Sequence, residues 1–136
     1  MDFLKSMSIA ASGLRAQAGR MRIISENIAN ADSTAQTPGG EPYRRKVPTF
    51  SSELDRSLDA RTVGLGKVRP DKSAFRLKHE PGHPAADANG NVKYPNVNSM
   101  VEMADMREAQ RSYEANLNVV GATRRMIQRT LDILKA

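Results

Sequence analysis

The segment His79–His83, which reads H-E-P-G-H, comes closest to a catalytic motif in this sequence. Zinc proteases that use H-E-x-x-H bind the metal through two histidines one helical turn apart and place the glutamate beside the metal-bound water. Here Pro81 removes a helix donor, Gly82 disfavours the helix and Pro84 follows directly. We therefore interpret the segment as a turn with two surface histidines. An enzyme built on those histidines is an alternative that zinc analysis of the purified protein would test.

Two other polar patterns begin like ligand-binding loops without completing them. The D-x-N-x-N spacing over residues 87–91 matches the start of a calcium-binding EF-hand loop, but Val92 replaces the loop's glycine and Asn98 replaces its final glutamate. Gly64 and Gly66 lack the third glycine and the following helix of a phosphate-binding loop. The sequence contains no cysteine for a thiol nucleophile or zinc ligand. We therefore expect no catalytic residue, no metal, no cofactor and no small-molecule substrate.

The densest basic run is Arg44-Arg45-Lys46, flanked by Tyr43 and Phe50. Such a run could bind phosphate, or it could form a solvated strand edge where positive charge discourages unwanted pairing. We favour the strand edge, because no nucleic-acid-binding motif accompanies the run. The formal net charge of +6 is also spread along the chain rather than concentrated in one tail. No nucleic acid is expected as a partner, and a basic helical nucleic-acid-binding protein is the alternative function.

Two long helices are predicted to position these segments, one at each end of the chain. The first lies within residues 2–30, which contain no proline. Apolar or small residues recur there at alternating spacings of three and four, a pattern typical of a helix with one narrow apolar seam. The seam consists of Leu4, Met7, Ala11, Leu14, Ala18, Met21, Ser25 and Ile28. Because three of these residues are small, a partner helix can approach closely but buries little area in each layer.

The second helix is predicted over residues 99–135, which also lack proline. Its seam has the same heptad spacing. The members are Met103, Met106, Gln110, Tyr113, Leu117, Val120, Arg124, Ile127, Leu131 and Leu134. Ser99 and Glu102 match the S-x-x-E capping box that marks a helix start. Acidic residues gather near this start and basic residues near the end, in agreement with the helix macrodipole.

All seven prolines lie between the two helices. Short strands are predicted over residues 43–50, 63–68, 74–78 and 91–94, and Asn89-Gly90 favours a tight hairpin turn. The predicted fold is mainly α, with the terminal helices forming an antiparallel coiled coil within or between chains and a small irregular middle region that contains strands. Residues 1–32 and 99–136 then form the coiled-coil domain, and the middle region covers residues 33–98.

The chain is poor in large apolar residues. Only 39% of its residues are hydrophobic, and tryptophan is absent. With Ala11, Ser25 and Arg124 at seam positions, a lone pair of helices should be held weakly, so we expect order to depend on neighbouring subunits. No apolar stretch is long enough to span a membrane. The first 21 residues do not match a Sec signal peptide, so any export is expected to use another route.

Residues at both ends resemble a known family. The segment 12–34 reads S-G-L-x-A-Q-x-x-x-M-x-x-I-S-x-N-I-A-N-A-D-S-T and is similar to the N-terminal signature of bacterial flagellar basal-body rod proteins. Further similar pieces are P-Y-R at 42–44, E-P-G-x-P-x-A-D-A-x-G-x-V-K-x-P-N-V over 80–97, E-M at 102–103 and R-S-Y-x-A-N over 111–116. They occur in the family's order, whereas residues 47–78 contribute little to the resemblance.

The resemblance implies a structural subunit of the flagellar rod, the axial tube that transmits torque and encloses the export channel. It implies export through the flagellar type III apparatus into the periplasmic rod, with other rod proteins and further copies of the chain as partners. In the family the two terminal helices form an inner coiled-coil layer, and the middle region touches adjacent subunits. The family-motif positions carried over to this sequence are Asn27, Asn30, Asp32, Tyr113 and Asn116. For residues 27–32 we favour a subunit-contact role over an ordinary helix stop.

Overall fold

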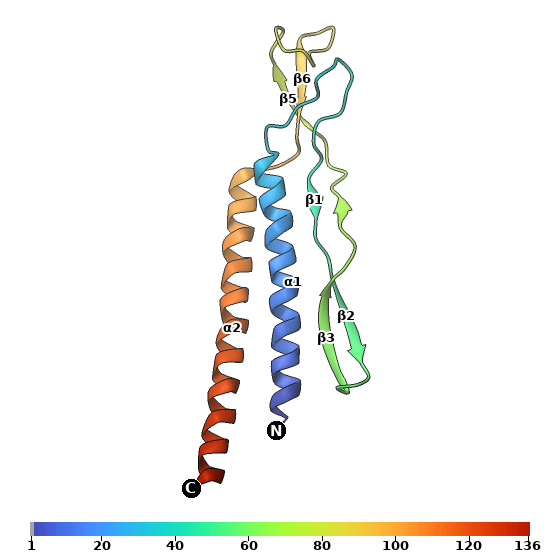
Figure 1. The fold of residues 1–136 in the computed structure, drawn as a ribbon. Coiled ribbons are helices and arrows are strands. Elements are labelled where there is room, and N and C mark those ends of the chain that lie inside the picture. The colour runs from blue at the N-terminus through green and yellow to red at the C-terminus, as the bar shows by residue number, and fades with distance from the viewer. Residues whose placement is uncertain (1) are drawn as a thin grey trace. The chain divides into compact units, whose positions relative to one another are not determined.

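The computed structural model describes residues 2–136. Helix α1 spans Phe3–Ala29 and helix α2 spans Ser99–Lys135 (Figure 1). Six short strands lie between them, namely β1 (Lys46–Val47), β2 (Phe50–Asp55), β3 (Ala60–Leu65), β4 (Arg69–Pro70), β5 (Arg76–His79) and β6 (Asn91–Tyr94). The two predicted helices and the mainly helical fold class are confirmed. None of the helices in residues 2–136 is long and apolar enough to cross a membrane.

Side chains just outside the helices cap both N-termini. The Asp2 carboxylate accepts hydrogen bonds from the backbone N–H groups of Leu4 and Lys5 at 3.1 and 3.2 Å. At α2 the cap is Asn98, whose side-chain oxygen accepts the N–H of Met100 at 3.1 Å. The predicted capping box of Ser99 and Glu102 is therefore wrong by one position. Asn98 caps equally well, and the Glu102 carboxylate has other partners in the interior.

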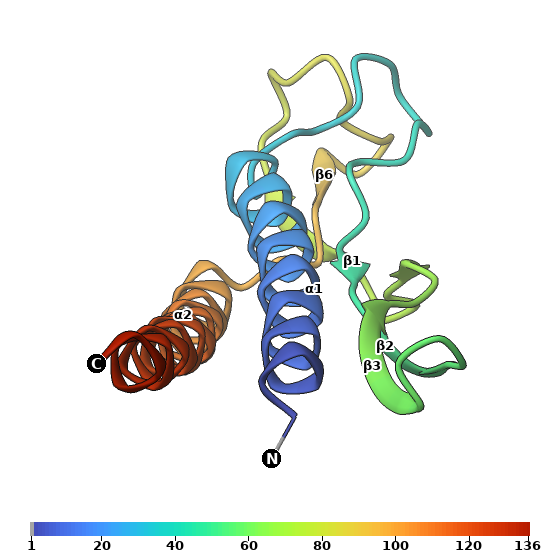
Figure 2. The same ribbon diagram turned by 60° about the horizontal axis from the view of Figure 1, so that its bottom comes forward.

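The chain divides into two compact units, and each contains part of both helices. Unit 1 comprises Met1–Met21, Thr49–Lys67 and Arg107–Ala136. Its β2–β3 hairpin runs beside the N-terminal part of α1 (Figures 1 and 2). The Ser12 hydroxyl accepts the backbone N–H of Val63 at 3.2 Å. A side chain at Gly19 would lie only 2.9 Å from the Leu65 side chain. Small residues on α1 thus let the hairpin approach the helix backbone closely.

Unit 2 comprises Arg22–Pro48 and Val68–Met106. It holds the last turns of α1, the β1–β4 and β5–β6 pairs and the first turns of α2. Its small apolar core is buried and is contributed by the last turns of α1, by β6 and by the loops beside them. The core residues are Ile23, Ile24, Ala31, Ala85, Val92, Pro95 and Val97.

All strand pairs are two-stranded and antiparallel. The predicted strand over 91–94 is confirmed as β6, and the strands predicted over 63–68 and 74–78 overlap β3 and β5. The prediction largely missed β2, whose sequence FSSELD is mostly polar and exposed. This strand is defined by its pairing along all of β3, from Phe50 opposite Leu65 to Asp55 opposite Ala60. Neither partner shows a clean alternation of apolar and polar residues.

The predicted tight hairpin at Asn89-Gly90 is also corrected. Gly90 has a positive φ of 78°, which suits glycine, and its N–H donates to the Asp87 carbonyl at 3.0 Å. However, β5 ends at His79 and β6 begins at Asn91, so the whole segment 80–90 connects the two strands. The turn that the dipeptide predicts closes only the last part of this longer loop.

Candidate assembly site

In unit 1 the two helices run antiparallel through a contact made of small and polar residues. A side chain at Gly13 would lie 2.8 Å from the Asn116 amide nitrogen, so this position allows close approach only because it is glycine. One heptad along α1, Arg20 forms an ion pair with Glu108 at 3.7 Å. The partner number on α2 falls as the number on α1 rises, as an antiparallel pair requires. This contact line on α1 passes through Gly13 and Arg20 and does not follow the predicted seam.

The predicted seam of α1 lies toward the outside of the chain. Leu4 is 71% exposed, and Ala18 and Ser25 are also exposed. The other apolar members, Met7, Leu14, Met21 and Ile28, are half-buried, while Ala10 and Ala16, which the seam omits, are buried. In unit 1 the buried positions of α1 carry small side chains, which let neighbouring backbones come close, whereas in unit 2 the buried positions include Ile23 and Ile24.

On α2 the contact line is displaced by one residue from the predicted seam. Ala109 and Thr123 are buried, and with Asn116 they form a line at heptad spacing. The seam members Met106, Tyr113, Val120 and Ile127 flank this line and are half-buried. The members Met103, Leu117, Leu131 and Leu134 are exposed. The prediction chose the line of largest hydrophobicity, whereas the helices meet along the adjacent line of smaller residues.

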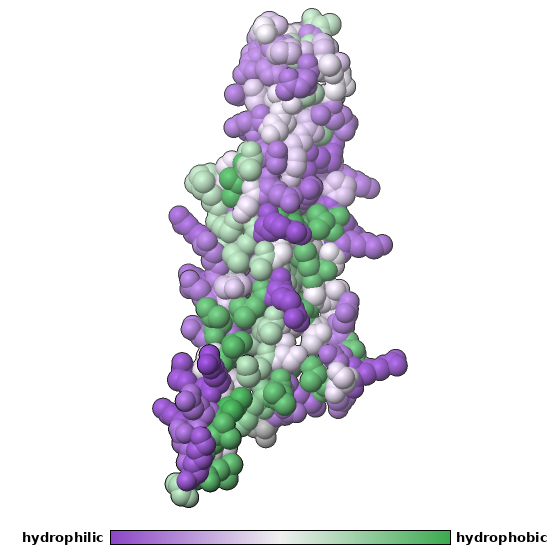
Figure 3. Space-filling view, viewed as in Figure 1, coloured by the Kyte–Doolittle hydropathy of each residue, from purple (hydrophilic) through white to green (hydrophobic). Residues whose placement is uncertain are grey.

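Large apolar side chains are exposed mainly on α2. Of fifteen such residues in the described part of the chain, nine lie on this helix, namely Met100, Val101, Met103, Leu117, Val119, Met126, Leu131, Ile133 and Leu134. Figure 3 shows apolar side chains gathered along the helices on the face drawn. The pairing of Gly13 with Asn116 puts the start of α1 opposite about residue 126, so the last turns of α2 continue alone. Leu131 and Leu134 project from these unpaired turns.

Unit 2 contrasts with this surface by holding a buried polar network. Its centre is the Asn27 side chain, which has no exposed surface. Asn27 accepts hydrogen bonds from the Tyr43 hydroxyl at 2.8 Å and from the Lys46 N–H at 2.9 Å. It donates to the Lys46 carbonyl at 2.8 Å and to the Glu102 carboxylate at 3.2 Å. The amide thus joins the end of α1 to β1 and to the first turn of α2.

Glu102 and Arg45 supply the charges of this polar network. The Glu102 side chain is 1% exposed and accepts a hydrogen bond from the Arg45 guanidinium. The same guanidinium lies 3.4 Å from Asp71 and 3.7 Å from Asp105. Burial lowers the pKa of Arg45, but hydrogen bonds to Glu102 and Asp71 outweigh burial and raise it overall. The buried Glu102 carboxylate thus has both a cation and an amide as hydrogen-bond donors.

The other basic residues of the run also have partners within the chain. The Arg44 guanidinium lies 4.1 Å from the centre of the Phe75 ring and donates to the Asp71 carbonyl at 2.8 Å. Lys46 pairs with Glu26 at 2.9 Å, and this contact lowers the pKa of Glu26 and raises that of Lys46. The basic side chains of the run therefore link segments of the chain through hydrogen bonds and ion pairs, rather than forming a phosphate-binding patch. Nothing in the described residues favours nucleic acid as a ligand.

The family-motif residues have different surroundings. Asn30 ends α1 by donating its side-chain amide to the Glu26 carbonyl at 2.8 Å, which is a helix-stop arrangement. Asp32 is exposed and lies 3.8 Å from Arg76. Tyr113 is half-buried on α2. A neighbour cannot reach the side chain of Asn27 in this conformation, so Asn27 acts inside the chain and Asp32 is the exposed member near it.

The two histidines of the H-E-P-G-H segment lie in the β5–β6 connection. His79 is exposed at the end of β5, and its Nδ1 lies 3.4 Å from the Asn91 side chain. His83 Nδ1 accepts the Ala85 N–H at 3.0 Å, and Nε2 lies 3.2 Å from the Thr34 hydroxyl. In residues 2–136 no group of three His, Cys, Asp or Glu side chains is arranged to hold a metal. The predicted turn is present, and the helix that H-E-x-x-H requires does not form there.

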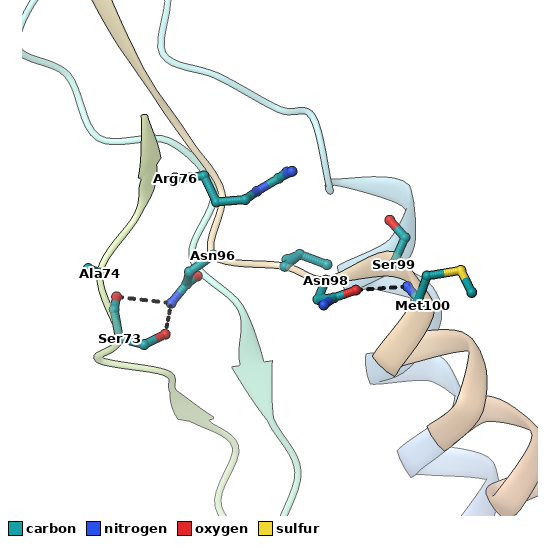
Figure 4. A pocket seen from close by; sticks show the side chains of 8 residues that line it. Ser73, Ala74, Arg76, Asn96, Asn98, Ser99 and Met100 are labelled. Atoms are coloured by element: carbon teal, nitrogen blue, oxygen red, sulfur yellow. Dashed lines mark hydrogen bonds between the residues drawn. The ribbon is translucent and has the colours of Figure 1, made fainter. Parts of the chain in front are cut away.

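An open hollow of about 460 Å³ lies beside the start of α2 (Figure 4). In it the Asn96 side chain donates to Ser73, and Asn98 caps the helix next to the exposed Met100. Arg76 on its wall donates to the carbonyls of Pro95 and Ala31, both at 3.0 Å. The polar groups named here thus already have partners within the chain.

The sequence analysis did not identify Arg45, Tyr43 and Asn96 as residues that link segments of the chain through hydrogen bonds. Asn96 accepts the Arg45 N–H at 2.8 Å and so fixes the strand that carries this guanidinium. One signal was available, because Tyr43 and Arg44 belong to a piece that resembles the family. The partner of Arg45 could not be found from the sequence, since Glu102 lies 57 residues further along the chain.

A chain that pairs a buried polar network internally and exposes large apolar side chains along a helix is typical of a subunit that completes its core in an assembly. Comparisons with known proteins agree with this class. A family model described as "Flagella basal body rod protein" matches residues 7–35, and one described as "Flagellar basal body rod FlgEFG protein C-terminal" matches residues 88–133.

Curated relatives match along their whole length. The chain is 56% identical to the flagellar basal-body rod protein FlgC of Agrobacterium fabrum, over 100% of this chain and 99% of that protein. It is 38% identical to FlgC of Salmonella typhimurium, over 98% of each chain, and 38% identical to FlgC of Bacillus subtilis, over 99% of this chain and 100% of that protein. The chain therefore belongs to the FlgC family of flagellar basal-body rod proteins.

Proposed function

We propose that this protein is a structural subunit of the proximal rod of the bacterial flagellar basal body. In that role it polymerises with itself and with other rod proteins into the axial tube that transmits torque and encloses the export channel. One structural observation supports the proposal in addition to family membership. The large apolar residues of α2 are exposed in the lone chain, while the polar network of unit 2 is buried and paired. The chain thus has a stable anchor and an apolar surface left to cover.

The exposed seam residues are the proposed contacts between subunits. Leu4 on α1 and Leu117, Leu131 and Leu134 on α2 are more than half exposed. In an assembly they would be covered by helices of neighbouring subunits, and the predicted coiled-coil seam would form between chains rather than within one. The heptad spacing supports this arrangement, because it keeps the same face of a long helix toward a partner. Burial of each such side chain contributes roughly 1.5–3 kcal/mol.

We further propose that the protein has no enzymatic activity and uses no cofactor. It is exported unfolded through the flagellar type III apparatus and reaches the periplasmic part of the rod. The contact of α1 with α2 in unit 1 supports export, because it consists of small residues and buries little apolar area. A contact of this kind is opened at low cost.

The proposal is tested by deleting the gene and examining the cell envelope by electron microscopy. Complementation with the wild-type gene is expected to restore rods and swimming. A gene that carries Leu131→Asp and Leu134→Asp is expected to restore neither, although the purified variant keeps its helix content. The matched control is Gln128→Asp, which adds a carboxylate at an exposed position of the same turns. Intact flagella in the deletion strain, or in cells with the doubly substituted protein, would refute the proposed role.

A further inference from the structure

The contact of α1 with α2 does not select its own alignment by apolar packing. The contact residues on α2 lie seven positions apart at Glu102, Ala109, Asn116 and Thr123. Those on α1 lie seven apart at Gly13, Arg20 and Asn27. These residues are small or polar, and each helix is continuous over its whole length. Sliding one helix by seven residues would again place small or polar residues opposite each other.

Glu102 makes the native alignment differ from the alignment shifted by seven residues. Its carboxylate is 1% exposed, and both of its hydrogen-bond donors occupy fixed places in unit 2. The Asn27 amide is held by the backbone of Lys46, and the Arg45 backbone is held by Asn96. After a seven-residue shift, the carboxylate would face neither donor. An unpaired buried charge carries a large penalty, so only one alignment suits this residue.

We propose that Glu102 is a register-setting residue, which selects one antiparallel alignment of the end of α1 with the start of α2. A single buried polar residue fixes the register of helix pairs in the same way in coiled coils. Because α2 is a continuous helix, its register also decides which exposed apolar residues it presents to other subunits. This second consequence rests on the proposed function, whereas the first concerns the isolated chain alone.

The competing explanation is that Glu102 only adds stability. The two are separated by replacing the whole network with apolar residues, as Asn27→Leu, Arg45→Met and Glu102→Leu together. Such replacement often preserves or raises the stability of a buried ion pair. If Glu102 sets the register, the triple variant stays helical but populates more than one alignment. If Glu102 only stabilises, the triple variant keeps the original alignment.

Alignment is measured by crosslinking in dilute solution, and only crosslinked products with the mass of a single chain are counted. The protein has no cysteine, so introduced pairs react without background. Arg20→Cys with Glu108→Cys reports the native register, since these side chains are 3.7 Å apart. Arg20→Cys with Ala115→Cys reports a shift of seven residues, because Ala115 lies one heptad beyond Glu108. A short bismaleimide joins whichever pair is close.

In the parent protein the native pair should crosslink about tenfold or more faster than the shifted pair. In the triple variant we expect the two rates to become comparable. Glu102→Gln keeps one acceptor oxygen, which can serve Asn27, but removes the charge and the acceptor that faces Arg45. Because one hydrogen bond is kept, it should reduce the ratio by a smaller factor than the triple variant. It replaces the triple variant if circular dichroism shows that the latter has lost its helices. The proposal would be overturned if the folded triple variant showed the same ratio of native to shifted crosslinking rates as the parent protein. The same holds for Glu102→Gln where it is used in place of the triple variant.

Complementation of the deletion strain then separates this inference from the proposed function. A triple variant that is helical and register-shifted but builds normal rods would overturn the link between register and assembly. Failure of the deletion to affect rods would instead overturn the proposed function and leave the register result intact. We expect the wild-type gene to restore rods and the triple variant to fail.

Discussion

The two units bury different kinds of surface. Unit 2 encloses a charged and amide-rich network around Asn27 and Glu102, in which each of these side chains has partners inside the chain. In unit 1 the helices meet through Gly13, Arg20 and small side chains, and large apolar residues remain exposed. Unit 2 therefore has a paired polar centre in the single chain, although it also exposes Met100, Val101 and Met103 at the start of α2. Unit 1 exposes more of the large apolar residues, chiefly along α2 from Leu117 to Leu134.

This difference between the units predicts that single substitutions in the buried network of unit 2 destabilise the lone chain more than single substitutions in unit 1. Glu102→Ala should lower the free energy of unfolding by about 2–4 kcal/mol, because it leaves the partly buried Arg45 with only Asp71 and Asp105 as charged partners. Urea unfolding followed by circular dichroism measures the change.

The matched control for that measurement lies in unit 1. Glu108→Ala removes the carboxylate that pairs with Arg20, but its side chain is 69% exposed. The loss should stay below about 0.5 kcal/mol. Equal losses for the two variants would remove the distinction between a network that is internally complete and a surface contact.

Apolar substitutions should show the same contrast in stability between unit 2 and unit 1, but the largest expected loss is smaller than that for Glu102→Ala. Val92 in β6 has no exposed surface, so Val92→Ala should cost about 2 kcal/mol through lost burial and a small cavity. Leu134→Ser removes a larger apolar side chain that is 76% exposed, and the lone chain should lose less than about 0.5 kcal/mol. Thermal unfolding of dilute protein measures both. A loss at Leu134 as large as that at Val92 would show that the end of α2 is already covered in the monomer.

Much of the fold follows from the sequence because the helices are long and periodic. Residues 2–30 and 99–135 lack proline and repeat their apolar residues with a helical period, and these signals are local. The strands are harder, because β2 is polar and exists through its pairing with β3. The paired residues of β3 lie five to fifteen positions further along the chain, and neither strand alone has a strong pattern.

The candidate site was predictable only in part. The predicted seam does not coincide with the contact between the helices, because the sequence ranks helix faces by hydrophobicity, whereas close approach at Gly13 and Gly19 favours faces with small side chains. The role of Glu102 was hidden for another reason. Its position three residues after Ser99 matches the S-x-x-E signal of a helix N-terminus, and only tertiary structure shows that its carboxylate turns toward Arg45. Long-range polar pairs leave no periodic trace in a sequence.

Glycine substitutions test how closely the helices of unit 1 approach. Gly121 on α2 has only the end of Arg125 within 4 Å, at 3.6 Å, so Gly121→Ala should stabilise the chain by about 0.5–1 kcal/mol through helix propensity. Gly13→Ala has the same propensity gain, but its new methyl group would lie 2.8 Å from the Asn116 amide, which must then move. We expect Gly13→Ala to be less stabilising than Gly121→Ala or to destabilise. Equal gains in urea unfolding would mean that the helices are not in close contact at Gly13.

The smallest predicted effect is a pH dependence in unit 2. Hydrogen bonds from the backbone and side chain of Ser73 lower the pKa of Asp71, and Arg45 lowers it further. A carboxyl group with a lowered folded pKa stabilises the protein above its unfolded pKa of about 3.9, and this contribution is lost as the pH falls through the folded value. Asp71→Asn keeps an acceptor for Ser73 but cannot ionise. Its stability deficit relative to wild type should therefore be present at pH 6 and shrink as the solution is acidified below about pH 4. Urea unfolding at a series of pH values measures this difference, with the exposed Asp132→Asn as control, and a deficit that stays constant with pH would show that the Asp71 charge contributes nothing to folding.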